Sequence, residues 1–110
     1  MQTKLGEDLT KRSERRDNTY YRELSPSHRE TVNEEVKQFL SKNKYQTSQR
    51  IVTERDKGNI ENSRILFRET IWHSIQNGEM DFYLEYIIYN SVITYGAKSF
   101  FDQLYNKVVL

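Results

Sequence analysis

The chain contains two histidines and no cysteine, so few of its side chains could carry out catalysis. His73 follows Glu69 by one helical turn, and the carboxylate could orient the imidazole as a general base or a metal ligand. The spacing places no nucleophile and no second ligand near this pair, and His28 belongs to no metal-binding motif. We therefore interpret His73 as a partly buried histidine with a local hydrogen bond. We predict no catalytic residue, no metal site and no cofactor.

Pairs of carboxylates give no stronger indication of catalysis. Glu79 and Asp81 are too close along the chain to face each other across a substrate. Glu61 and Glu85 could converge only through the fold, which spacing alone does not test. The sequence contains no nucleophile elbow, no Walker loop and no dinucleotide fingerprint. We expect that the protein is not an enzyme.

The basic side chains could bind phosphate groups. The net charge is only +1, but the bases gather in the first half of the chain, most densely over residues 11–16. Such an arm, together with a short basic helix, could bind a nucleic-acid backbone with little sequence readout. Acidic residues are interleaved among these bases, so a solvated charged surface is the simpler interpretation. The candidate phosphate contacts are Arg12, Arg15, Arg16, Arg50, Arg55 and Lys57.

Aromatic side chains give the strongest functional signal. The chain has eight Tyr and five Phe, whereas Ala97 is its only alanine. Tyrosine is enriched at interfaces because it combines apolar area with a polar tip. We expect an interface in the second half of the chain, either a homodimer seam or a groove for another protein; a purely internal aromatic core is the alternative. The interface candidates are Tyr83, Tyr86, Tyr89, Phe101 and Tyr105.

Short helices are expected to position these side chains. The sequence predicts an all-α fold, a compact bundle of four to five short helices over residues 25–110. The first helix is expected to open within residues 25–30, because Ser27 and Glu30 have the spacing of a capping box and Pro26 sits where its missing N–H costs little. It is expected to end before a polar connection over 41–46. Gly58, Gly78 and Gly96 are expected to end the next three helices. These helices are predicted over about 47–58, 62–77 and 79–95, with Asn62 capping the second, and a last helix follows Gly96.

The predicted helix over residues 79–95 differs from the others in character. Its rings and aliphatic side chains surround the axis almost completely, which is typical of a helix in a core or at an interface. The same residue types also favour a strand. However, the apolar tract is longer than a usual strand of about 5–6 residues and contains no turn residue. We therefore predict a helix.

Residues 1–24 are predicted to form a flexible charged tail, because they contain too few apolar side chains to offset the entropy lost on ordering. The N-terminus lacks an apolar signal-peptide segment and the chain lacks a run of about 18 apolar residues, so we expect a cytoplasmic protein with no membrane contact.

The function we expect is that of a small non-enzymatic protein that acts by protein–protein interaction. It would be an inhibitor, adaptor or regulator of the kind that viruses and mobile elements carry, an inference by analogy. The expected partners are a second copy, in a homodimer, or another protein. The alternative is a nucleic-acid-binding regulator that contacts the phosphate backbone.

Overall fold

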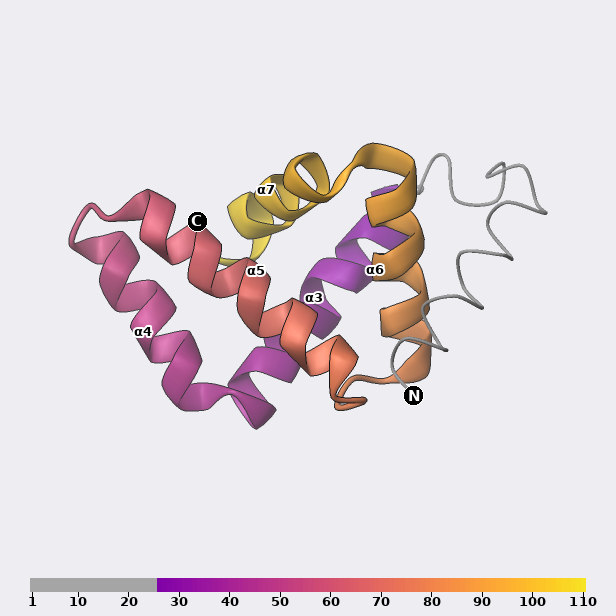
Figure 1. Cartoon of the computed structure of the whole chain (residues 1–110), viewed down its shortest axis with the longest axis horizontal. Helices are drawn as coiled ribbons and strands as arrows, with labels where there is room; N and C mark the ends of the chain where they lie inside the picture. Colours follow the sequence, from indigo (N-terminus) through magenta and orange to yellow (C-terminus); the bar gives the residue numbers. More distant parts are fainter. Residues whose placement is uncertain (1–25) are drawn as a thin grey trace.

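A computed structural model of the chain describes residues 26–110, and the predicted tail lies outside the described residues together with Arg12, Arg15 and Arg16. The described residues form five α-helices and no strand, which confirms the all-α prediction. Figure 1 labels the helices α3 (Pro26–Asn43), α4 (Tyr45–Asp56), α5 (Ile60–Gln76), α6 (Phe82–Tyr95) and α7 (Ala97–Val108).

Helix α3 is the centre of the bundle, because it packs against α4, α6 and α7. Helices α4 and α5 form an antiparallel hairpin on one side of it (Figure 1). Helix α6 stands at the opposite end of the molecule, and α7 turns back from it across the bundle (Figure 1). Among the described residues, α6 packs mainly against α3 and α7.

The core forms where the apolar periods of the helices meet. The predicted stripe of α3 is buried along its whole length, and α4 adds the fully buried Ile51. Because α4 contributes so little apolar area, its place depends on the hairpin with α5. The buried apolar side chains of α3, α5, α6 and α7 are Val32, Val36, Phe39, Leu40, Phe67, Ile71, Ile75, Leu84, Ile87, Ile88, Phe100, Phe101, Leu104 and Tyr105.

The expected caps of α3 and α5, Ser27 and Asn62, both lie inside their helices. Helix α3 begins at Pro26, whose fixed φ suits a first helical position. Ser27 therefore lies inside the first turn, where its carbonyl accepts a hydrogen bond from the Thr31 hydroxyl at 3.1 Å. Helix α5 begins at Ile60, so Asn62 also lies inside the helix. Pro26 belongs to the expected opening of α3, whereas α5 follows Asn59 in place of Asn62.

The predicted polar connection over 41–46 is wrong as well, because only Lys44 separates α3 from α4. The backbone hydrogen bonds continue almost unbroken through this corner: the Lys44 N–H donates to Leu40 O at 2.9 Å, and the Ser48 N–H donates to Lys44 O at 2.8 Å. The Lys44 ammonium also lies 2.8 Å from Glu79 Oε1. This ion pair joins the corner to the connection between α5 and α6.

Glycines end α4 and α5 as predicted. Gly58 has a φ of +89° and follows α4 in a Schellman motif, in which the Asn59 N–H donates to Glu54 O at 2.9 Å. The same pair of backbone bonds recurs around Gly78, which has a φ of +69°. A left-handed residue is needed at both places, and glycine adopts that conformation without steric strain.

Gly96 is expected to tolerate substitution less well than Gly58. Its φ of +92° and ψ of +144° fall in a region that is nearly restricted to glycine, whereas asparagine suits the left-handed position of a Schellman motif. A Cβ at either glycine would meet no atom within 4 Å, so the penalty is one of backbone conformation. Gly96→Asn should lower the free energy of unfolding by about 1–3 kcal/mol in a urea titration. Gly58→Asn is the matched control and should change it by less than about 0.5 kcal/mol. Equal losses would contradict this explanation.

Candidate functional site

The solvent-facing side of α6 carries four apolar or aromatic side chains in one line. Phe82, Tyr86, Tyr89 and Ile93 follow each other at steps of four, three and four residues, which places them on one side of a helix. Phe82 is 51% exposed and Ile93 36% exposed, while Tyr86 and Tyr89 are half-buried. These four side chains are named the α6 face. It contains no charged group.

The buried side of α6 combines apolar and polar side chains. Glu85, Asn90 and Ser91 are buried, although a surface helix usually turns such residues to water. The sequence of α6 is apolar all round because Leu84, Ile87 and Ile88 fill the core side while aromatic rings lie on the solvent side. An apolar side turned to water is favourable to bury.

Ring stacking holds the α6 face in place. The Phe82 and Tyr86 rings stack with their centroids 6.4 Å apart and their planes at 20°. The Tyr89 ring stacks on Trp72 of α5 at 5.9 Å, and Trp72 meets the buried Phe101 edge-on at 5.7 Å. The centre of the face is therefore tied to the core, so little side-chain entropy remains to be lost on binding.

Tyr83 lies off the α6 face, although the sequence predicted it for the same interface as Tyr86 and Tyr89. Tyr83 follows Phe82 directly, so its side chain is rotated by about 100° around the helix axis from that of Phe82. The Tyr83 hydroxyl is hydrogen-bonded to His28 Nε2 at 2.7 Å, so this side chain faces α3. The structure adds instead Phe82 and Ile93, which the sequence analysis did not select. Phe82 lies four residues before Tyr86 and Ile93 four residues after Tyr89, and this spacing could have placed them on the same side of the helix.

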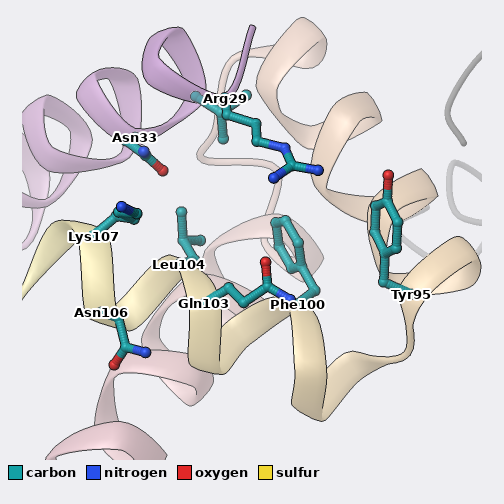
Figure 2. A pocket seen from close by; sticks show the side chains of 9 residues that line it. Arg29, Asn33, Tyr95, Phe100, Gln103, Leu104, Asn106 and Lys107 are labelled. Atoms are coloured by element: carbon teal, nitrogen blue, oxygen red, sulfur yellow. The ribbon is translucent and has the colours of Figure 1, made fainter. Parts of the chain in front are cut away.

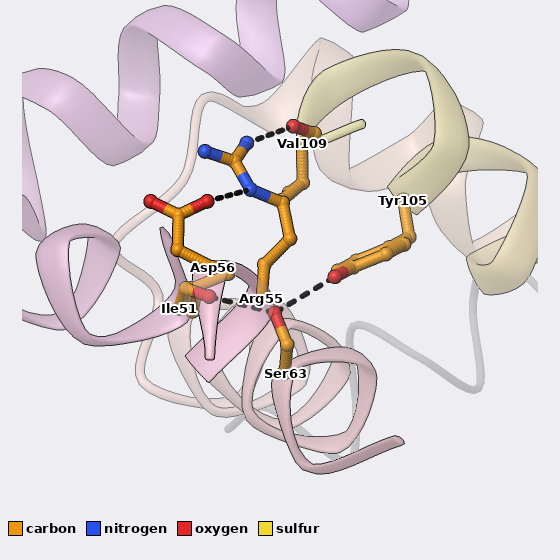
Figure 3. Close-up of polar contacts among 6 residues, drawn as sticks. All are labelled: Ile51, Arg55, Asp56, Ser63, Tyr105 and Val109. Atoms are coloured by element: carbon orange, nitrogen blue, oxygen red, sulfur yellow. Dashed lines mark hydrogen bonds and ion pairs between the residues drawn. The ribbon is translucent and has the colours of Figure 1, made fainter. Parts of the chain in front are cut away.

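Phe101 and Tyr105 are buried in the core, so their prediction as interface residues is wrong. The Tyr105 hydroxyl donates to Ser63 Oγ at 2.8 Å, and the Ser63 hydroxyl donates to the Ile51 carbonyl at 2.7 Å (Figure 3). This chain of two hydrogen bonds crosses from α7 through α5 to α4. Tyr105 therefore uses its polar tip inside the molecule.

The basic residues of α4 are largely engaged within the molecule. Arg55 Nη1 donates to the Val109 carbonyl at 2.5 Å, and Arg55 Nε lies 2.9 Å from Asp56 Oδ1 (Figure 3). Lys57 is paired at 3.8 Å with a glutamate one turn earlier. Arg50 is exposed. Nucleic-acid binding through this helix would therefore have to release Arg55 from the C-terminal end of the chain.

The structure assembles none of the predicted pairs into a polar centre. His73 and Glu69 are both exposed, which corrects the expectation of a partly buried histidine, and no hydrogen bond joins them. Glu61 is exposed in the first turn of α5, whereas Glu85 is buried within α6. Within residues 26–110, no three His, Asp or Glu side chains gather closely enough to hold a metal ion.

A groove of about 240 Å³ lies between α3 and α7 (Figure 2). Val32, Phe100 and Leu104 form its apolar floor, and all three are largely withdrawn from solvent. Arg29 of α3 and Lys107 of α7 stand along it from opposite walls (Figure 2). The groove combines an apolar floor with cationic walls, so it differs in chemistry from the α6 face.

Glu85 is the one acid that α6 turns inward. Its side chain is 2% exposed, and Oε2 has no hydrogen-bond partner. Burial raises the pKa of this carboxyl, because the charged form loses its hydration. The folded chain consequently holds the proton more tightly than the unfolded chain does.

Glu85→Gln is expected to make the protein more stable than wild type at neutral and alkaline pH, where the buried carboxyl of the wild type has to ionise. Because the folded pKa lies above the ordinary value of 4.5, the wild-type free energy of unfolding should fall as pH rises from about 4.5 through the raised pKa. Thermal unfolding from pH 4 to pH 8 should show similar stabilities at the acid end and a more stable variant at the alkaline end. Glu61→Gln is the control, since Glu61 is exposed. Parallel pH curves for wild type and Glu85→Gln would contradict the prediction.

Comparison with protein-family models, with curated proteins and with solved structures found no match to this chain. None of the described helices combines the length and the hydrophobicity that a transmembrane span requires. The features of the molecule that bear on function are therefore the α6 face and the groove between α3 and α7.

Proposed function

We propose that this protein acts by protein–protein interaction through the α6 face, and that its partner is a second copy of the same chain. The observation that carries the proposal is the exposure of apolar side chains on α6: Phe82 and Ile93 lie in water, although Glu85 and Asn90 of the same helix are buried. An exposed apolar surface of this kind is stabilised when a partner covers it.

The spacing of the α6 face favours a second copy as the partner. Steps of four, three and four residues read the same in both directions along the helix. Two α6 helices run antiparallel when the two-fold axis lies perpendicular to them, and Phe82 of one copy then lies opposite Ile93 of the other. Tyr86 lies opposite Tyr89 in the same way. A two-fold interface uses the same patch on both copies, and this face is complementary to itself in position and in charge.

The proposed role is non-enzymatic and cytoplasmic, as the sequence predicts. A regulator or adaptor of this design would present the rest of its surface to other molecules while α6 holds the dimer. Nucleic-acid binding stays the alternative, and it rests on the predicted phosphate contacts outside the described residues and on the exposed Arg50.

The test is the molar mass of the full chain by light scattering behind size exclusion, at several protein concentrations and at low and high salt. A dimer is expected, and because the α6 face is uncharged its dissociation should change little with salt. A mass of one chain up to several hundred micromolar would overturn the proposed dimer. A dimer that dissociates at high salt would point to charged surfaces instead.

A further inference from the structure

We propose that the groove between α3 and α7 binds a small organic anion: a carboxylate attached to a flat apolar body about the size of one aromatic ring. This site is separate from the α6 face, and its occupancy does not depend on dimer formation.

The cations of the groove are available to a ligand. Arg29 and Lys107 stand on opposite walls, and within the described part of the chain no acidic side chain pairs with either of them. The Arg29 guanidinium extends across the groove near the Phe100 ring, and the Asn33 amide points toward Lys107 (Figure 2). A guanidinium binds a carboxylate through two parallel hydrogen bonds, and an ammonium adds a second charge.

The floor sets the size and polarity of the rest of the ligand. Val32, Phe100 and Leu104 offer carbon atoms from two helices in a groove of about 240 Å³. A cavity of about 150 Å³ accommodates benzene, so the groove has room for one ring and a short acidic side chain. A ring on Phe100 gains stacking or edge contacts in addition to burial.

The surroundings of the groove disfavour a long polyanion such as nucleic acid. A second hollow shares Arg29 and Lys107 with it, and its other charged lining residues are Lys37, Glu30 and Glu34. Glu34 is already paired with Lys37 at 3.5 Å. Phosphates that followed the surface beyond the groove would meet these carboxylates. Beyond the groove the surface therefore carries charges of both signs, which favours a compact anion over a long one.

The experiment titrates the full chain with 3-phenylpropanoate and follows backbone amides by NMR. Half-saturation is expected below about 1 mM, with the largest shifts around Val32, Phe100 and Leu104. The neutral analogue 3-phenylpropan-1-ol should bind at least about tenfold more weakly, because it cannot use the two cations. Inorganic phosphate should also bind at least about tenfold more weakly, because it leaves the floor uncovered.

Charge-removing variants locate the site. Arg29→Gln and Lys107→Gln should each weaken binding of 3-phenylpropanoate by about tenfold while leaving the thermal unfolding midpoint unchanged, since both side chains are exposed. Lys37→Gln is the matched control, because it removes a nearby exposed cation outside the groove, and it should not alter binding. Absence of binding, equal binding of acid and alcohol, or shifts centred elsewhere would overturn the proposal. Displacement of the probe by a short DNA duplex would overturn it in favour of a phosphate-backbone site.

Discussion

Tyr105→Ala is expected to lower the free energy of unfolding by about 3–5 kcal/mol, which is a large share of the roughly 5–15 kcal/mol that stabilises a small domain. Tyr105 is completely buried and meets the Phe67 ring edge-on at 5.6 Å. The guanidinium of Arg64 lies 5.5 Å from the centre of the Tyr105 ring. Truncation leaves a cavity, removes both ring contacts and deprives Ser63 of its hydrogen-bond donor. Urea unfolding followed by Trp72 fluorescence measures the loss at one fixed protein concentration.

Two further variants separate the contributions of Tyr105. Tyr105→Phe keeps the ring and removes only the hydroxyl, so it should cost about 0.5–1.5 kcal/mol. Tyr45→Ala is the control for loss of a tyrosine as such, because Tyr45 is 62% exposed at the start of α4. It should change stability by less than about 0.5 kcal/mol. If Tyr105→Ala were no more damaging than Tyr45→Ala, the central place of Tyr105 in the core would be contradicted.

Features that depend on a few consecutive residues could be predicted from the sequence. The apolar period of α3 places Val32 and Val36 on one side of any helix, and a glycine after such a period indicates a left-handed residue. Gly58 and Gly78 fulfil this expectation. Helix starts were predicted less well, because more than one residue near each start is of a type that marks it. Helix α5 begins at Ile60 after Asn59 and not after Asn62, and α3 begins at Pro26 and not after Ser27.

The candidate surface could be predicted only in part, because exposure is a property of the packed helices. The sequence shows that α6 is apolar all round, but α3 and α7 decide which side of it is covered. In the sequence, Phe101 and Tyr105 are aromatic residues of apolar helices just as Tyr86 and Tyr89 are. Only the packing of α7 shows that Phe101 and Tyr105 are buried. The groove was missed for the same reason: Arg29 and Lys107 are far apart in the chain, and only the contact between α3 and α7 brings them to one site.

Ile93→Glu is expected to abolish the proposed dimer at micromolar concentration, with a rise of at least about 100-fold in its dissociation constant. Each copy contributes Ile93, so a two-fold interface would bury two unpaired carboxylates, and an unpaired buried charge costs several kcal/mol. Phe82→Lys should have the same effect for the same reason. Analytical ultracentrifugation over a concentration series measures both. Tyr45→Glu, a charge introduced at an exposed ring on α4, is the control and should leave the dimer intact.

Mixing the two monomeric variants tests the antiparallel arrangement itself. In a mixed dimer one Phe82–Ile93 contact is unchanged, and at the other the introduced lysine faces the introduced glutamate. The mixture should therefore form dimers at concentrations where each variant alone is monomeric, which a general loss of folding could not produce. A parallel pairing of α6 helices would place these positions at opposite ends and give no recovery. Dimers of Ile93→Glu alone, or a mixture that stays monomeric, would show that α6 does not pair in this way.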